Sequence, residues 1–249
     1  RYLSSGAGET IIFLHGLGSC VEDWDFQVDY FSQFFHVVAV DMRGHGLSAK
    51  PHGEYTIEQM ANDIVELTQK LDIKSAHCIG LSLGAMVLFQ IALDRPELIK
   101  SMVIVNATPK VDRSTFRKKL LIAIRFFIAR VLGLNVAGKI LAKKLFPHPE
   151  QIQLRKKFLK GWSRNKKHAY LSVAHAIINW NISDELHKIN IATLVVSGEF
   201  DYTSVEVKEK YMRCIKNARL EVVKNSGHAT PADQPEYFNK IVKKFIRGH

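Results

Sequence analysis

The motif with the clearest chemistry is Gly80-Leu81-Ser82-Leu83-Gly84, in which a serine stands between two glycines. It follows a short apolar run, Ser75–Ile79, and opens an apolar helical pattern over Leu83–Leu93. Glycines at both ends remove side-chain clashes at a sharp strand-to-helix turn and leave the serine hydroxyl exposed at the helix N-terminus. This context predicts that Ser82 is a nucleophile.

A serine hydroxyl needs a base that takes its proton. Asp201 and His228 each come soon after a later apolar run, Thr193–Ser197 and Leu220–Val223 respectively. Serine, acid and histidine in this chain order form one of the known triad arrangements. We expect His228 to relay the proton and Asp201 to orient the ring and stabilise the imidazolium. Glu199, which is nearer the strand end, is the competing acid.

Acyl transfer also needs N–H groups that stabilise the developing oxyanion. One expected donor is the backbone N–H of Leu83, directly after the serine. The other is the backbone N–H of Leu17, within the glycine-rich loop His15-Gly16-Leu17-Gly18. Leu17, Leu83 and Trp24 are expected to contact substrate, although Trp24 fits a core position equally well.

Six short apolar runs position these residues. Most are rich in Val and Ile, and each stops at or near a turn-forming residue. Their apolarity is largely continuous, which is typical of strands buried on both faces. The runs are Ile11–Leu14, Val37–Val40, Ser75–Ile79, Ser101–Val105, Thr193–Ser197 and Leu220–Val223.

Helical patterns lie between these runs, for example Ile57–Leu71, with apolar residues at spacings of three and four. Further helices are expected over Leu83–Leu93, Ser204–Cys214 and Pro235–Ile246. The alternation predicts an α/β fold with a mostly parallel sheet and helices on both faces. The core would comprise residues 1–106 and 187–249.

Residues 107–186 interrupt this rhythm, because they contain helical patterns but no convincing strand. Helices are expected over Phe116–Leu132, Gln151–Trp162 and His168–Trp180. The segment is long for a connection between strands, so we expect a helical cap, or lid, inserted into the core.

Charge sets this insertion apart. The chain has 249 residues and a net charge of +11. Lys110–Lys167 holds seventeen Lys or Arg and only two acidic residues, a net charge of +15. The basic surface has three interpretations: a solvated face, a docking face for an acidic partner, or a peripheral contact with a membrane surface. Nucleic acid is disfavoured because no recognised binding motif is present.

The composition excludes several other classes of protein. A hydrophobic fraction of 47% with 24% charged residues suits a globular protein and excludes a disordered chain. Three scattered cysteines predict neither a disulfide framework nor a zinc site, and no metal or organic cofactor is implied. The sparse cysteines make the reducing cytoplasm the expected location. The first ten residues lack an apolar signal-peptide core, but the chain begins with Arg rather than Met, so a trimmed targeting segment stays open. The G-x-G within Asp41–Ser48 is interpreted as a structural turn rather than a phosphate site.

Together these motifs resemble the α/β-hydrolases, and within them small carboxylesterases such as the pimeloyl-[acyl carrier protein] methyl ester esterases. The resemblance rests on His15-Gly16-Leu17-Gly18, Asp41–Ser48, Gly80–Gly84, Gly198-x-x-Asp201 and Gly227-His228. It implies an eight-stranded sheet with the cap between strands six and seven. Family members usually have a hairpin before the strand at Ile11, but only ten residues precede it here, so that edge should be reduced.

The expected function is therefore serine carboxylic-ester hydrolysis through an acyl-enzyme. The resemblance adds a candidate substrate, an ester linked to acyl carrier protein, such as the pimeloyl methyl ester of biotin synthesis. Small-molecule esters are the other substrates considered. The alternatives are a ligand-binding or sensor protein on a hydrolase scaffold, a carbon–carbon bond hydrolase, and a lipid esterase at a membrane surface.

Overall fold

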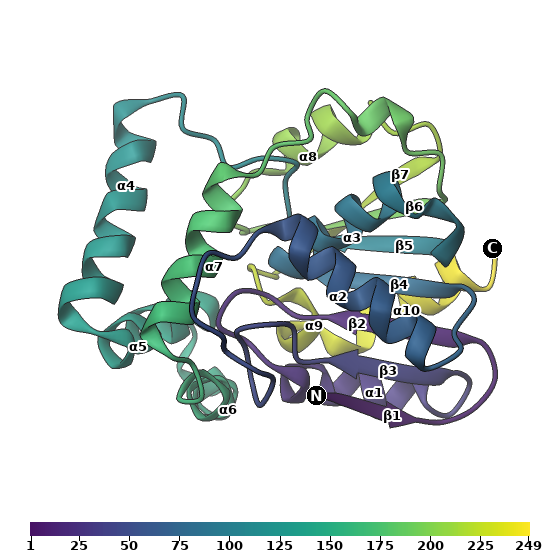
Figure 1. Cartoon of the computed structure of the whole chain (residues 1–249), viewed down its shortest axis with the longest axis horizontal. Helices are drawn as coiled ribbons and strands as arrows, with labels where there is room; N and C mark the ends of the chain where they lie inside the picture. Colours follow the sequence, from purple (N-terminus) through teal and green to yellow (C-terminus); the bar gives the residue numbers. More distant parts are fainter.

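The computed structural model describes residues 1–249, which fold around a single seven-stranded sheet (Figure 1). In the order β1-β3-β2-β4-β5-β6-β7, all neighbouring strands are parallel except β1, which runs antiparallel to β3. The strands are β1 (Tyr2–Ser5), β2 (Thr10–Leu14), β3 (His36–Val40), β4 (Ala76–Leu81), β5 (Ile99–Val105), β6 (Thr193–Gly198) and β7 (Ala218–Val223).

Helices cover both faces of this sheet and create two separate apolar cores. One core lies under α2 and α3, and the other lies under α1 and α10. In α2, buried apolar residues recur at helical spacing, and the Thr56 hydroxyl caps its first turn by accepting from the N–H of Gln59. These helices are α1 (Asp25–Phe31), α2 (Ile57–Lys70), α3 (Leu83–Asp94), α8 (Val205–Met212), α9 (Thr230–Asp233) and α10 (Pro235–Ile246).

Four helices lie in the insertion between β5 and β6, with a small apolar core of their own centred on Phe158, Trp162 and Tyr170. Figure 1 places α4 at the end of the molecule farthest from the sheet, with α7 between them. The insertion comprises α4 (Phe116–Phe127), a π-helical turn (Ile128–Leu132), α5 (Leu134–Leu145), α6 (Ile152–Trp162) and α7 (Lys167–Asn179). All of them fall within the expected cap segment, 107–186.

The predicted fold class is confirmed, and two details differ. The sheet has seven strands rather than the eight implied by the resemblance, so the insertion lies between the fifth and sixth strands. The strand β1 was not among the predicted strands, because Tyr2–Ser5 is a polar, half-exposed edge segment without an apolar run. Short helices connect other elements: Val21–Trp24, Pro96–Leu98, Pro149–Gln151 and Leu186–Lys188.

The predicted strand at Ser75–Ile79 and the predicted helix at Leu83–Leu93 correspond to β4 and α3, with Ser82 in the turn between them. None of the helices combines the length and apolar character that crossing a bilayer requires.

Candidate active site

Ser82 occupies a strained turn between β4 and α3. Its backbone is in a positive-φ conformation (φ 53°, ψ −108°), which is rare for a residue with a side chain. The two flanking glycines are sterically required: a Cβ on Gly80 would lie 2.5 Å from the backbone N of Ala85, and one on Gly84 would lie 2.1 Å from the carbonyl oxygen of Leu14. The turn is therefore held by tight packing of α3 against β2.

His228 and Asp201 form a close pair beside this turn. His228 Nδ1 lies 2.5 Å from Asp201 Oδ1, and the Asp201 side chain is fully buried. Burial alone would raise the pKa of Asp201, but its hydrogen bond to His228 and the charges of His228 and Lys208 outweigh burial and hold that pKa well below its ordinary value. Asp201 is therefore ionised at neutral pH and can orient and stabilise a protonated imidazole.

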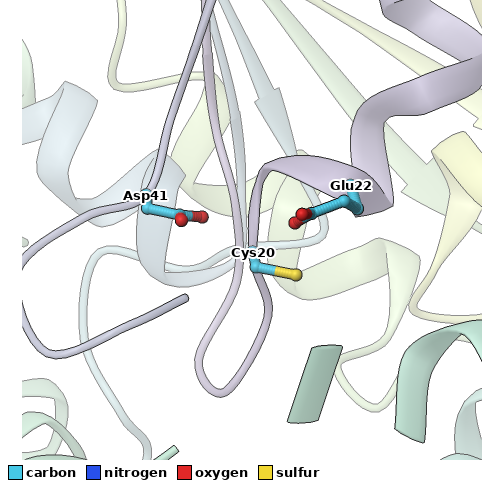
Figure 2. Close-up of side chains that lie close together, drawn as sticks. All are labelled: Cys20, Glu22 and Asp41. Carbon is cyan, nitrogen blue, oxygen red and sulfur yellow. The ribbon is translucent and has the colours of Figure 1, made fainter. Parts of the chain in front are cut away.

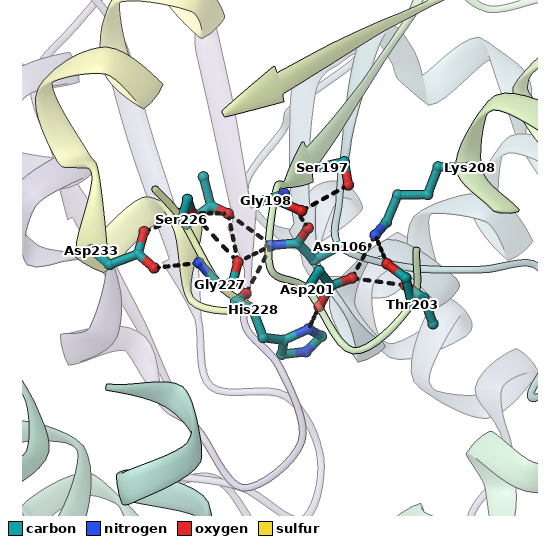
Figure 3. A network of polar contacts seen from close by, with 11 residues as sticks. Asn106, Ser197, Gly198, Asp201, Thr203, Lys208, Ser226, Gly227, His228 and Asp233 are labelled. Atoms are coloured by element: carbon teal, nitrogen blue, oxygen red, sulfur yellow. Dashed lines mark hydrogen bonds and ion pairs between the residues drawn. The ribbon is translucent and has the colours of Figure 1, made fainter. Parts of the chain in front are cut away.

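The other oxygen of Asp201 is held by a buried lysine (Figure 3). Lys208 Nζ donates to Asp201 Oδ2 at 2.5 Å and to the carbonyl oxygen of Thr203 at 2.7 Å, while the Thr203 hydroxyl donates to the same carboxylate oxygen at 2.7 Å. The Lys208 side chain is fully buried. Burial lowers the pKa of Lys208, and the Asp201 carboxylate opposes that change.

Asn106, the residue directly after β5, joins the acid and histidine loops (Figure 3). Its side-chain oxygen accepts from the N–H of Gly198 at 2.8 Å. Its side-chain nitrogen donates to the carbonyl oxygens of Gly227 and His228 at 3.1 and 2.9 Å, and also contacts the Thr230 hydroxyl at 2.8 Å. One amide thus sets the spacing between the ends of β6 and β7.

Ser82 and His228 line the same cavity, which has a volume of about 260 Å³. Most of its lining residues are hydrophobic, and they come from both the sheet edge and the insertion. The ring of Tyr202 stacks on His228 with centroids 4.3 Å apart, and Lys144 Nζ of α5 lies over the Tyr202 ring, 4.1 Å from its centroid. No hydrogen bond joins Ser82 Oγ to His228 in this structure, and such contacts often tighten only when substrate binds.

The glycine-rich loop after β2 is positioned from both sides. His15 Nδ1 donates to the carbonyl oxygen of Gly16 at 2.8 Å, and Nε2 accepts from the N–H of Met42 at 3.1 Å. On the other side Gly18 has a φ of +79°, and a Cβ there would lie 2.3 Å from the Trp162 indole of α6. Asn165 Nδ2 also donates to the carbonyl oxygen of Gly18 at 2.8 Å.

The three residues expected to contact substrate have different positions. Leu17 lines the cavity, and so does Trp24, which also packs on Phe13 with ring centroids 4.8 Å apart; contact of either residue with substrate stays a prediction. The side chain of Leu83 is fully buried in the core and does not line the cavity. Only the backbone N–H of Leu83 is therefore available for the expected role.

Two other expectations have clear outcomes. Glu199 is exposed, and its carboxylate accepts from the N–H of Asn225 at 2.9 Å, so it does not contact His228. The Asp41–Ser48 turn is structural: Asp41 accepts from the N–H groups of Val21 and Leu47, both at 2.8 Å, and a Cβ on Gly46 would collide with that carboxylate.

A model of the α/β-hydrolase fold matches residues 9–235 of the chain. The protein belongs to the α/β-hydrolase family. This hydrolase is 26% identical to 3-oxoadipate enol-lactonase 2 of Acinetobacter baylyi over 95% of its own chain and 88% of that protein. It is 36% identical to the dihydrolipoyllysine-residue acetyltransferase component of the acetoin cleaving system of Cupriavidus necator, over its whole chain and 66% of that protein. The enol-lactonase structure from Burkholderia xenovorans superposes with a TM-score of 0.91 at 24% identity, covering 99% and 96% of the two chains.

One cluster in the hydrolase has side chains of the kind that bind metals: Cys20, Glu22 and Asp41 (Figure 2). Its carboxylates are already engaged by guanidinium groups. Arg1 contacts Asp41 at 3.1 Å and Glu22 at 2.9 Å, and Arg164 contacts Glu22 at 2.7 Å. Burial raises the pKa of Cys20, which keeps it a thiol rather than a thiolate ligand. This cluster does not fit a metal; it ties Arg164 of the insertion to the core.

Sequence reasoning missed three polar residues at the hydrolase site. Lys208 and Asn106 hold the acid and histidine loops, and Asp23 lines the cavity beside Ser19, whose hydroxyl donates to it. Burial raises the pKa of Asp23 to about 6. Asn106 carried a usable signal, because it directly follows a predicted strand at the same sheet edge as the other site residues.

Proposed function

We propose that this protein hydrolyses carboxylic esters or lactones with apolar acyl groups through a serine acyl-enzyme. The observation that carries the proposal is the Asp201–His228 pair, which shares one apolar cavity with Ser82 at a strained strand-to-helix turn. The enol-lactonase relatives support the same class of bond.

In the first half-reaction Ser82 Oγ attacks the substrate carbonyl carbon while His228 Nε2 takes its proton. Asp201 holds Nδ1 and stabilises the imidazolium. The N–H groups of Leu17 and Leu83 are the proposed donors to the oxyanion. Neither N–H donates one of the backbone hydrogen bonds of the turns and loops. When the tetrahedral intermediate collapses, His228 returns the proton to the leaving alkoxide.

Water completes the reaction. His228 removes a proton from water, the resulting hydroxide attacks the acyl carbon, and Ser82 leaves with the proton from His228. A lactone follows the same route, except that its alcohol stays attached to the acyl group after ring opening. No cofactor is required for either step.

The cavity suggests the size and character of the substrate. About 260 Å³ lies just below the usual range for drug-sized ligands, roughly 300–1,000 Å³. Its wall is mainly apolar, with Asp23, Arg125 and Lys157 as charged groups. We therefore expect a preference for short acyl groups.

The pimeloyl ester on acyl carrier protein is a narrower hypothesis within this proposal. It requires the basic insertion to attract the acidic carrier. Hydrolysis of a carrier-linked ester should then slow at high salt, while hydrolysis of a small neutral ester should not. Equal salt dependence for the two substrates would argue against carrier docking.

The test of the main proposal is hydrolysis of p-nitrophenyl esters, from acetate to long acyl chains. Wild type should hydrolyse the short esters fastest, and Ser82→Ala should lower kcat by at least about a thousandfold. The matched control is Ser19→Ala, the same substitution at the other serine that lines the cavity, which should retain most activity.

Activity that survives in Ser82→Ala would refute the assignment of the nucleophile. No wild-type activity towards any ester or lactone, from a sample with a cooperative unfolding transition, would favour the ligand-binding alternative. A rapid burst of p-nitrophenol followed by a slower steady rate would identify the acyl-enzyme.

A further inference from the structure

The helix α4 and the turn after it carry an apolar stripe on their outer surface, here called the outer stripe. Its members recur at spacings of three and four residues, which places them on one helical face about 22 Å long. Phe116 is 81% exposed, and the other members are between 44% and 61% exposed. The outer stripe consists of Phe116, Leu120, Ile124, Phe127 and Val131.

The outer stripe is not apolar in order to line the cavity, because none of its residues lines it. The side of α4 that lines the cavity carries a different set of residues: Ile122, Arg125 and Phe126. The helix therefore has apolar residues on two faces, and every residue of α4 is at least partly exposed. A contiguous exposed apolar surface of this kind marks an interaction site in a globular protein.

The insertion is attached to the core by other elements. Asn165, after α6, donates to the carbonyl oxygen of Gly18, and Arg164 pairs with Glu22 at 2.7 Å. In α7, His168 contacts the carbonyl oxygen of Lys50 at 3.0 Å. In contrast α4 meets α7 through its inner face, where Arg125 Nε donates to the Tyr170 hydroxyl at 3.2 Å and the Phe126 and His175 rings lie 4.5 Å apart, and it lies at the outer end of the molecule (Figure 1). Its outer face is free for a partner.

The charge around the stripe indicates what that partner is. Arg117 lies on one side of the stripe, and Lys119 and Arg130 lie on the other; all three are exposed and form no ion pair. The whole segment Lys110–Lys167 carries a net charge of +15. An apolar stripe bordered by Lys and Arg is the pattern of a helix that lies in the interface of an anionic membrane.

A second copy of this chain fits the stripe poorly. In a twofold dimer the same patch faces itself, so two strongly basic surfaces would oppose each other. An acidic protein would satisfy the charge. A bilayer also accepts a long convex apolar stripe, because the aliphatic stems of the bordering Lys and Arg can lie along it while their charged ends reach the headgroups.

We propose that the outer stripe and its bordering basic residues dock this protein onto an anionic lipid bilayer, with α4 parallel to the membrane surface. The apolar side chains enter the headgroup boundary, and Arg117, Lys119 and Arg130 contact lipid phosphates. In this orientation α4 lies between the bilayer and the cavity. Docking does not depend on the hydrolysis proposed above.

The experiment is vesicle flotation of the full chain carrying Ser82→Ala, so that no hydrolysis alters the lipids. Vesicles of phosphatidylglycerol and phosphatidylcholine in equal parts are compared with phosphatidylcholine alone. We expect binding at least about tenfold stronger to the anionic vesicles, weakening as salt is added.

Three pairs of substitutions in that background locate the contact. Ile124→Ser with Phe127→Ser should reduce binding at least about tenfold. Arg117→Gln with Lys119→Gln should reduce binding and its salt dependence. The matched control is Leu47→Ser with Val207→Ser. It removes two exposed apolar side chains that lie outside the insertion, and it should bind like the parent.

Absence of flotation of the folded parent with anionic vesicles at low salt would overturn the proposal, and so would equal binding by the stripe pair. The proposal also fails if sedimentation shows a dimer that the stripe pair converts to a monomer. With Ser82 restored, the stripe pair should hydrolyse a soluble p-nitrophenyl ester at the parent rate, so docking and hydrolysis are tested separately.

Discussion

Replacing the buried Lys208 tests how the Asp201 carboxylate is held. Both side chains are fully buried, and Lys208 Nζ lies 2.5 Å from Asp201 Oδ2. Lys208→Met keeps a side chain of similar length but leaves the carboxylate without its buried cation and the Thr203 carbonyl oxygen without its donor. Removing one partner of a buried ion pair costs about 3–5 kcal/mol. At roughly 2–4 °C per kcal/mol for a chain of this size, the Tm should fall by about 6–20 °C.

The assays are thermal unfolding for the Tm and urea denaturation for the free energy of unfolding, both monitored by circular dichroism at neutral pH. The matched control is Lys210→Met on the same helix, where the lysine is exposed and the free energy of unfolding should change by less than about 0.5 kcal/mol. In an Asp201→Asn background, Lys208→Met should cost about 2 kcal/mol less than in wild type, because no buried anion is then left unpaired. A loss no larger than that of the control, or an equal loss in both backgrounds, would refute the reasoning.

The loss of stability caused by Lys208→Met should depend on pH. The pKa of Asp201 is held below its ordinary value in the folded state, so its ionisation stabilises the fold above about pH 4. That contribution is lost as the pH falls through the folded-state pKa. Lys208→Met raises the pKa of Asp201, so the difference in stability between wild type and variant should be full at neutral pH and shrink below about pH 4.

Three further substitutions test other contacts. Burial raises the pKa of Asp23 to about 6, so its ionisation costs stability progressively from about pH 4, its ordinary pKa, and fully above about pH 6; Asp23→Asn should be about 1–2 kcal/mol more stable than wild type at pH 8, with the gain in Tm narrowing as the pH falls towards 4. Asn106→Asp replaces a donor by an acceptor that faces two carbonyl oxygens, so the kcat of ester hydrolysis should fall at least about tenfold. An unchanged kcat would exclude a role for Asn106 in positioning the His228 loop. Gly84→Ala places a Cβ 2.1 Å from a backbone oxygen and should cost about 3 kcal/mol or more in urea denaturation, whereas Gly248→Ala, with its nearest atom at 3.5 Å, should cost less than about 0.5 kcal/mol.

The residues that sequence reasoning placed well all follow predicted strands. Ser82 follows β4, Asp201 follows β6 and His228 follows β7. Parallel strands bring their carboxyl ends to one edge of the sheet, so a residue's place after an apolar run is enough to locate it. The structure brings these side chains together, and their catalytic roles remain predictions. Glu199 also follows β6, and only the side-chain geometry separates it from Asp201.

The features that were missed depend on contacts that no local pattern reveals. Lys208 lies on a helix where a lysine usually faces solvent, and its burial follows from the carboxylate seven residues earlier. The strand β1 forms because β3 offers it a free edge, not because Tyr2–Ser5 is apolar. Leu83 follows the serine, but the first turn of α3 directs its side chain into the core.

The contact between Gly18 and Trp162 has a consequence for protein engineering. Exchanging the insertion between related hydrolases is an obvious route to a new substrate range, and it treats the lid as a module that can be replaced. Here the indole of α6 and the Asn165 amide fix the backbone of the loop that carries Leu17. A transplanted lid without equivalents of these two side chains would alter that loop as well as the pocket. A chimera should therefore retain the junction from Trp162 to Asn165 and vary α4 and α5 instead.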